Sequence, residues 1–419
     1  MEDIKLTAFP AKNGESLLVE LYGKEKINIL IDLGYSDTYN KYIKKKLKQI
    51  SKNGEQIDLL ILTHYDKDHI EGVIEFFNDL LVNRYIEINE IWVNDYLAIS
   101  SSKIELDKLN EDKKNIYDLS NFIMMEYRLN DSVRKKQNIS NGDMVTVTKL
   151  IKMLELDSKV NKRFEDRIVY VGEKENSIKI TDDITLNILS PTIDILKALR
   201  LNYINWINKE GNLYSYISKE ELFELFIANL DDNIREFADN VLVKQEVANQ
   251  LNSKELINTV LNSSKVYNKN SLTNQSSIAF ELLFKNNSIL FTGDIDCKNI
   301  VNKVKSKSYS LIKIPHHGSK NNIDRSFLKS VQCKNYLIST DGSGRSRHPD
   351  LETIVFIAES QQTNIYINYK LNEFSIDNDV IDELKKIYEF NLIDFKSDES
   401  SCLELDLKEG EVLWKNVNF

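Results

Sequence analysis

All five histidines of this 419-residue chain lie in three short motifs, in which they stand next to or near other polar residues. The motifs are 64–69 (HYDKDH), 315–319 (PHHGS) and 347–350 (RHPD). Two of them directly follow apolar segments that are typical of buried strands, 57–63 and 311–314. Imidazole is the commonest metal ligand in proteins and carries protons near neutral pH. This restricted placement indicates a metal or acid–base site that is built at the ends of strands.

Apolar and polar stretches alternate along the chain as in an α/β protein. A lysine-rich helix is expected over 39–51. Strands are expected at 26–32, 57–63, 90–93, 184–190, 277–284, 288–291, 311–314, 336–339, 364–369 and 402–407. Asn286 and Asn287 predict a turn that joins two of these strands in a hairpin.

Two long stretches, 97–165 and 192–270, have a polar and helical pattern instead. We interpret them as helical insertions in a β-rich α/β core. The core would then be formed by residues 1–96, 166–191 and 271–419.

The composition narrows the class of protein. A formal net charge of −10 argues against a general coat for nucleic acid, although it leaves room for a local basic groove. Three cysteines without a CxxC pair indicate reduced thiols of a cytoplasmic protein. The N-terminal residues do not resemble a signal peptide, and no apolar run approaches the ~18 residues that a membrane span needs. We therefore expect a cytoplasmic protein without a membrane partner.

The first motif packs four ligand-type side chains into a tight loop. If alternate residues point the same way, His64 and Asp66 hold one ion, and Asp68 and His69 turn toward a second. Two ions about 3.5–4 Å apart can share one nucleophile and clamp both sides of a displacement. Mixed imidazole and carboxylate ligands suit Zn²⁺, and also Mn²⁺ or Fe. The alternative is a solvated acidic loop with chance histidines.

The second and third motifs add further ligand-type residues. Asp294 follows a strand and a glycine, which places its two oxygens to bridge two ions, although Gly-Asp alone is also a common turn. Adjacent histidines usually point apart, so one of His316 and His317 is expected to bind metal. The other could bind the second ion, act as a general acid or contact a phosphate.

The loop before His348 is glycine-rich and cationic. Arg345 and Arg347 in this loop could meet a phosphate by paired hydrogen bonds. An ordinary surface loop with an exposed histidine is an equally good interpretation.

The order of the motifs resembles the metallo-β-lactamase fold superfamily. That family has an acid after an early strand, matched by Asp32, and a His-x-[His/Asp]-x-Asp-His loop, matched by 64–69. It also has a Gly-Asp after a late strand and a later histidine, matched by Asp294 and His316/His317.

A finer resemblance is to the branch found in DNA-uptake competence proteins (ComEC type) and in phosphorylcholine esterases. Asp66 stands in the second ligand position, as in that branch. Leu189-Ser190-Pro191, Asn274-Gln275-Ser276, Thr292-Gly293-Asp294, the HHGS motif and a His-Pro follow in the same order.

The resemblance implies a four-layer αβ/βα sandwich with one or two divalent ions, Zn²⁺ or Mn²⁺, at one edge of the two sheets. The implied metal ligands are His64, Asp66, Asp68, His69, Asp294 and His317, with Asp32 orienting a ligand from behind. His316 and His348 would be catalytic together with Asp68, and a metal-bound hydroxide would be the nucleophile. Ser319, Arg345 and Arg347 would contact the substrate.

Three functions are compatible with these residues. The first is a metal-dependent phosphodiester hydrolase, more specifically a nuclease, which the lysines at 44–48 and 303–307 favour. The second is a hydrolase of a small phosphodiester, such as a cyclic nucleotide or a phosphocholine-like ester. The third is a metal-binding subunit of a bacterial defence or competence assembly, whose helical insertions dock a protein partner.

Overall fold

The structure is a computed structural model, and it describes the chain in eleven ranges. These ranges are 3–95, 98–99, 143–172, 176–210, 253–262, 271–343, 347–360, 362–370, 376–394, 401–408 and 411–418. Much of both predicted insertions lies outside the described residues, and so does Arg345.

The first sheet joins the two ends of the described chain. Its strand order is β17-β16-β1-β2-β3-β4-β5. The strands are β1 (Ile4–Ala8), β2 (Leu17–Tyr22), β3 (Lys26–Ile31), β4 (Leu59–Ile61), β5 (Ile91–Trp92), β16 (Ser401–Lys408) and β17 (Glu411–Asn418). Strand β1 pairs with β16 in antiparallel register, from Ile4 opposite Leu407 to Ala8 opposite Leu403. Strands β3, β4 and β5 run parallel, so their carboxyl ends lie at the same edge.

The second sheet has the order β15-β14-β13-β11-β9-β8-β7-β6. Its strands are β6 (Ser177–Lys179), β7 (Ile184–Ser190), β8 (Ala279–Phe284), β9 (Asn287–Phe291), β11 (Leu311–Lys313), β13 (Asn335–Ile338), β14 (Thr363–Ile367) and β15 (Phe390–Asp394). Strands β9 to β15 pair in parallel. A separate pair links β10 (Ser308–Tyr309) to β12 (Gln332–Cys333).

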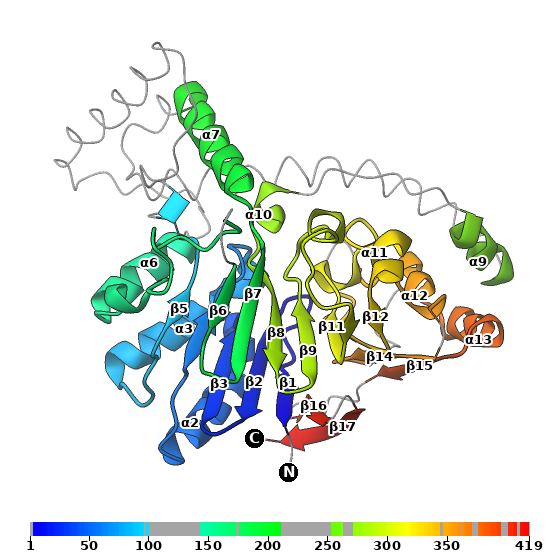
Figure 1. Cartoon of the computed structure of the whole chain (residues 1–419), viewed down its shortest axis with the longest axis horizontal. Coiled ribbons are helices and arrows are strands. Elements are labelled where there is room, and N and C mark those ends of the chain that lie inside the picture. The colour runs from blue at the N-terminus through cyan, green and yellow to red at the C-terminus, as the bar shows by residue number, and fades with distance from the viewer. Residues whose placement is uncertain are drawn as a thin grey trace.

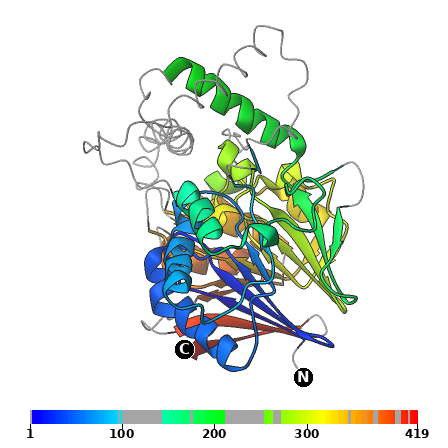
Figure 2. The ribbon, with the colours of Figure 1, turned by 90° about the vertical axis from the view of Figure 1, so that its left-hand side faces the viewer.

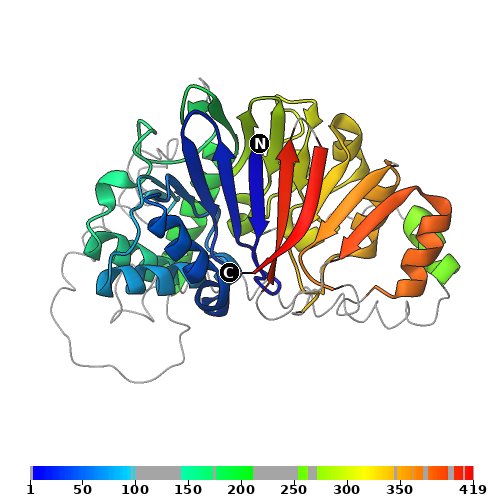
Figure 3. The same cartoon turned by 90° about the horizontal axis from the view of Figure 1, so that it is seen from below.

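Figure 3 shows strands of the first sheet, coloured blue and red, in front of the yellow-green strands of the second. Apolar side chains at alternate strand positions bury the facing sides of the two sheets. Leu6, Val19 and Ile29 of the first sheet share one buried cluster with Phe280 and Leu282 of the second. A strand turns successive side chains to opposite faces, so the intervening residues bury the outer faces against helices. Burying one such Leu or Phe side chain is worth about 1.5–3 kcal/mol.

Helices pack on the outer faces of both sheets (Figures 1 and 2). On the first sheet these are α2 (Lys44–Lys52), α3 (Lys67–Val82) and α6 (Asp143–Met153). On the second they are α9 (Ser253–Asn262), α11 (Arg325–Ser330), α12 (Leu351–Ala358) and α13 (Asn378–Ile387). The other described helices are α1 (Ser36–Thr38), which continues into α2 through a π-helical turn (Tyr39–Ile43), α7 (Ile193–Glu210) and α10 (Leu272–Gln275). The protein is therefore a mixed α/β structure, as the sequence predicts.

Most predicted elements are present. The helix expected at 39–51 is part of the helical run 36–52, and the hairpin β8–β9 turns one residue earlier than expected, at Lys285–Asn286. Of the strand expected at 57–63, only β4 is a regular strand, and Ile57 forms an isolated bridge with Ile88. The sequence does not predict strands β1, β2, β6, β10, β12, β15 and β17.

Two further expectations bear on the class of protein. The three cysteines all lie in the described ranges and form no disulfide. Across the same ranges, no helix combines the length and the apolar character that crossing a membrane requires.

Candidate metal centre

Four strands end beside one another and carry the predicted ligands. Asp32 directly follows β3, and His64 lies just beyond the end of β4. In the second sheet, Asp294 lies just beyond the end of β9 and His316 just beyond the end of β11. Because β3 and β4 are parallel neighbours, and so are β9 and β11, each sheet delivers its pair of ligand-bearing loops to one edge.

The start of α3 explains why the acidic residues of the first motif are available. Asp66 occupies the position before the helix, where an aspartate usually accepts hydrogen bonds from the first turn. Its side chain makes no such bond here, and its Oδ1 is buried without a hydrogen-bond partner among the described residues. Asp68 and His69 lie in the first turn.

Asp32 holds the two histidines of this motif in place. Its Oδ2 accepts hydrogen bonds from His69 Nδ1 (2.8 Å) and Thr63 Oγ1 (2.6 Å), and its Oδ1 accepts one from the Thr63 backbone N–H (2.8 Å). His64 Nδ1 in turn donates to Thr63 Oγ1 (3.0 Å). With both Nδ1 atoms used as donors, this network assigns the Nε2 lone pairs of His64 and His69 to the site.

The ligands of the second sheet sit in strained loops. His316 and His317 have φ angles of 47° and 54°, which non-glycine residues rarely adopt. Such strain persists only where the surroundings determine it, and it clusters at functional sites. His317 Nδ1 donates to the Ser339 carbonyl (2.9 Å), so its Nε2 also faces the site. Gly318 has a φ of 91°, and a Cβ there would lie 2.6 Å from Pro349 Cβ.

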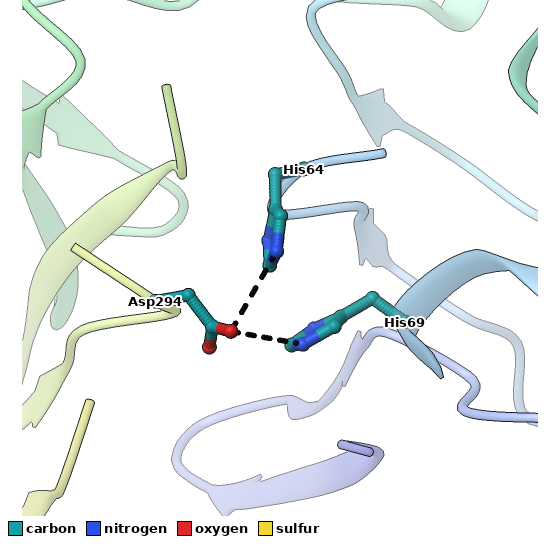
Figure 4. Close-up of side chains that lie close together, drawn as sticks. All are labelled: His64, His69 and Asp294. Carbon is teal, nitrogen blue, oxygen red and sulfur yellow. Dashed lines mark ion pairs between the residues drawn. The ribbon is translucent and has the colours of Figure 1, made fainter. Parts of the chain in front are cut away.

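The Asp294 carboxylate lies among the histidines. Its Oδ2 is 3.7 Å from His64 Nε2, 3.6 Å from His69 Nε2, 3.6 Å from His317 Nε2 and 3.9 Å from His316 Nε2. Figure 4 shows the carboxylate pointing between the rings of His64 and His69. The backbone of Asp294 is held by Ser277 Oγ (3.2 Å) and by the side-chain amide of Asn322 (2.8 Å).

Within the described ranges, two groups of side chains could hold an ion. One is His64, His69 and Asp294, and the other is Asp68, His69 and His317. In each group, the ligand atoms all lie within 4.8 Å of one another. The structure thus groups His69 with His64. The expectation that alternate residues of the loop point the same way instead pairs His64 with Asp66. Asp66 Oδ2 is nevertheless only 3.6 Å from His64 Nε2.

The chemistry of these atoms fits a metal ion. The Nε2 atoms of His64, His69 and His317 and an oxygen of Asp294 are buried and lack any hydrogen-bond partner in the part of the chain that the structure describes. Leaving one buried polar group unsatisfied costs about 1–3 kcal/mol. Several such atoms in one place are explained if they share a cation.

The electrostatics are those of a compact acid–imidazole cluster. Burial alone would raise the pKa of Asp294, but His69, His317 and His316 lower it well below 3.8. Burial would lower the pKa of His69, but Asp294, Asp32 and Asp68 raise it well above 6.5. Burial opposes the shift of Asp68 as well, yet His69 and His317 bring its pKa down to about 2. The carboxylates are therefore ionised and ready to bind a cation at neutral pH.

His316 and His348 form a second imidazole pair beside the ligands. Their ring centroids are 5.3 Å apart, and His348 Nδ1 lies 3.3 Å from Asp350 Oδ2. His316 Nδ1 donates to Asn322 Oδ1 (3.0 Å), and burial lowers the pKa of His316 to about 4. The structure thus separates the adjacent histidines, with His317 in a ligand group and His316 facing His348.

The two described residues that are predicted to contact substrate differ in exposure. Arg347 is exposed next to His348, whereas Ser319 is 2 % exposed and its hydroxyl accepts a bond from the Asn321 N–H (3.4 Å). Of the predicted basic segments, Lys44 pairs with Asp79 and Lys305 bonds Ser177.

The prediction missed the residues that support the ligands. These are Thr63, Asn322, Ser277, Ser339, Glu15 and Lys313. Lys313 had a signal in the sequence, because a lysine within the apolar strand β11 requires a buried partner. The others are polar loop residues with no signal of their own.

We expect the metal affinity of the centre to rise with pH. A proton on His69 Nε2 competes with an ion, and the acidic neighbours that raise the pKa of His69 make that proton harder to displace. Below this raised pKa, the affinity gains about tenfold per pH unit for each proton released, and above it the gain stops. Titration with Co²⁺ at roughly pH 6, 7 and 8 measures the slope. A flat profile over this range would contradict the displacement of a proton from His69 on metal binding.

Substitution of Asp32 by asparagine is expected to weaken metal binding by about 10- to 100-fold. An amide has one acceptor oxygen, so it cannot satisfy Thr63 and His69 together, and the His69 ring loses its orientation. A Zn²⁺ competition titration measures the affinity. The control is Asp79→Asn, which removes a carboxylate that accepts from Tyr39 on the outer side of α3 and should leave the affinity unchanged.

The comparisons with known proteins agree with this geometry. A family model of the metallo-beta-lactamase superfamily matches residues 11–91, a range that contains Asp32, His64 and His69. No curated protein matches the chain significantly. Members of this superfamily are generally hydrolases that bind divalent metals, and the two His/Asp groups are candidate ligands.

Proposed function

We propose that the protein is a metal-dependent phosphodiester hydrolase. The observation that carries this proposal is the convergence of unpartnered, buried imidazole nitrogens on the Asp294 carboxylate, with a further imidazole pair next to them. Ligand groups that share His69 suit one ion or two neighbouring ions. That arrangement suits a phosphodiester, because negative charge builds up on its oxygens during attack.

The residues divide into ligands and supporting groups. His64, His69 and Asp294 would hold one ion, with Asp66 beside them, and Asp68, His69 and His317 would hold the other. When bound, Zn²⁺ or Mn²⁺ at these residues would provide a water of lowered pKa and would neutralise phosphoryl charge. Asp32 keeps His69 in the tautomer that presents Nε2.

The imidazole pair beside the ligands would act on the substrate itself. His348 would protonate the leaving oxygen, since its ring is less buried than the ligand rings and is paired with Asp350. The His316 side chain is partly exposed and its pKa is lowered by desolvation, so it would accept a hydrogen bond or position the reacting group. Arg347 is exposed next to this pair, where a phosphate or a neighbouring anionic group could be bound.

Nucleic acid is the first substrate class of this proposal, and a small phosphodiester is the second. One observation favours the second class. The lysines that suggested a polymer-binding surface are in part engaged within the protein, because Lys46 pairs with the buried Glu20 and Lys44 with Asp79. Binding to a long polyanion would instead need a free cationic track beside the site.

The proposal extends to the family branch and to the layers of the fold. One apolar cluster joins the two sheets, and two others join each sheet to the helices on its outer face. This arrangement supports a four-layer αβ/βα sandwich. Asp66 beside His64 supports the competence-type branch. Residues 97–165 and 192–270 would be insertions, and a protein partner would bind there.

The test is a substrate panel with purified protein. Single-stranded DNA, duplex DNA, RNA and bis-(p-nitrophenyl) phosphate are incubated with Mn²⁺ or Zn²⁺, with and without a chelator. The wild type and Asp68→Ala are compared, with the exposed Asp37→Ala as the control. Polymer cleavage that Asp68→Ala loses supports a nuclease, and turnover of the ester alone supports the second class. Metal binding without any turnover would overturn the hydrolase and favour a metal-binding subunit.

A further inference from the structure

The short segment Gly14–Ser16 contacts loops from both halves of the metal centre. Ser16 Oγ donates to the Asp32 carbonyl (2.9 Å), and the Glu15 N–H donates to the Asp68 carbonyl (3.2 Å). The Gly14 carbonyl accepts from Ser339 Oγ (2.9 Å). Ser339 is the residue whose own carbonyl orients His317. This segment therefore touches three of the loops that carry or orient ligands.

A buried ion pair extends these contacts to the fourth loop. The Glu15 side chain pairs with Lys313 Nζ, and the two residues are 1 % and 0 % exposed. Lys313 Nζ also donates to the Gly293 carbonyl (3.2 Å), immediately before Asp294. The same carbonyl accepts the His316 N–H (3.2 Å). Glu15 and Lys313 thus join the loop of Asp68 to the loops of Asp294 and His316.

Gly14 shows how closely the parts fit. A Cβ at this position would lie 2.1 Å from the Asp68 carbonyl oxygen. The backbone of the segment therefore lies directly against the first turn of α3, and a larger residue would displace Asp68. Close-packed interiors transmit such displacements instead of absorbing them.

We propose that Glu15 and Lys313 are positioning residues that set the spacing between the ligands of the first sheet (Asp68 and His69) and those of the second (Asp294 and His317). The inference rests on the metal centre of the proposed function. The pair lies behind the ligands, since the Lys313 amine is engaged by Glu15 and the Gly293 carbonyl.

The energetics of buried ion pairs are compatible with a positioning role. Taking two charges out of water is costly, so such a pair adds little stability over apolar residues of similar size. Lys313 also donates to the Gly293 carbonyl beside Asp294, so the pair fixes the position of that loop, which apolar side chains could not do. Residues behind metal ligands typically change affinity by about 10- to 100-fold when they are lost.

The test is the double variant Glu15→Leu/Lys313→Met, which removes both charges and leaves no unpaired one. We expect it to fold, to bind Co²⁺ about 10- to 100-fold more weakly than the wild type, and to give an altered visible Co²⁺ spectrum. The matched control is Glu20→Leu/Lys46→Met, which removes a second buried ion pair remote from the ligands. The control should keep the wild-type affinity and spectrum.

The outcomes separate the inference from the metal centre itself. If the double variant binds Co²⁺ with wild-type affinity and spectrum, the pair is purely structural and the inference is wrong. If the wild type does not bind Co²⁺, the proposed metal centre fails and the inference fails with it. Should the double variant not fold, Glu15→Asp replaces it, because this variant keeps the charge and shortens its reach. Reduced affinity in a folded Glu15→Asp protein supports positioning, and unchanged affinity overturns it.

Discussion

Replacing Asp294 with alanine is expected to lower hydrolysis below about 1 % of the wild-type rate and to remove most of the bound metal. Asp294 Oδ2 is within 3.6–3.7 Å of three imidazole Nε2 atoms, so its loss affects both candidate ligand groups at once. It also leaves the raised pKa of His69 without its largest acidic cause. Metal content is measured by elemental analysis, and turnover with bis-(p-nitrophenyl) phosphate.

The control for this variant comes from the same loop. Asp296 is also buried, but its side chain accepts from the Lys298 N–H and pairs with the Lys298 amine instead of facing the histidines. Asp296→Asn should therefore retain metal and activity. If Asp294→Ala binds as much metal as the wild type, Asp294 is not a ligand, and the proposed arrangement of the centre is wrong.

The two adjacent histidines are expected to respond in different ways. His317→Ala should weaken metal binding at least about 100-fold, because His317 Nε2 lies 3.4 Å from Asp68 Oδ2 within a ligand group. His316→Ala should keep metal affinity within about threefold and reduce turnover by about 10²- to 10⁴-fold, the range of an acid–base or positioning group. Titration with Zn²⁺ and steady-state kinetics measure the two effects.

Each variant of the pair serves as the control for the other. The two side chains leave neighbouring positions of one strained loop, so general damage to the loop would affect metal and turnover alike in both. Loss of metal in His316→Ala with retention in His317→Ala would reverse the assignment. Equal loss of metal and turnover in both variants would contradict the division of roles between the two histidines.

Much of the ligand set could be predicted because each ligand follows an apolar strand. Residues that come just after parallel strands collect at one edge of a sheet, so the sequence is enough to identify the candidate ligands. It is not enough to predict which of them share an ion. The prediction assumes that residues 64–69 form a loop in which alternate side chains point the same way. Because α3 begins at Lys67, the side chains beyond Asp66 instead follow the 3.6-residue period of a helix. This is why the structure groups His69 with His64.

The unpredicted parts of the fold depend on contacts between distant residues. Strand β1 is short and lies between β2 and β16, so one of its partners comes from the other end of the chain. No local pattern encodes such a pairing. The same is true of Glu15, whose role is apparent only once Lys313 and the Asp68 loop are seen against it.

The most direct test of the central claim is the metal content of the purified wild-type protein. The protein is incubated with Zn²⁺ or Mn²⁺, freed of unbound ions by gel filtration and examined by elemental analysis. We expect about one or two ions per chain, retained by the two His/Asp groups. A content below about a tenth of an ion per chain with both metals would contradict a metal centre at this site.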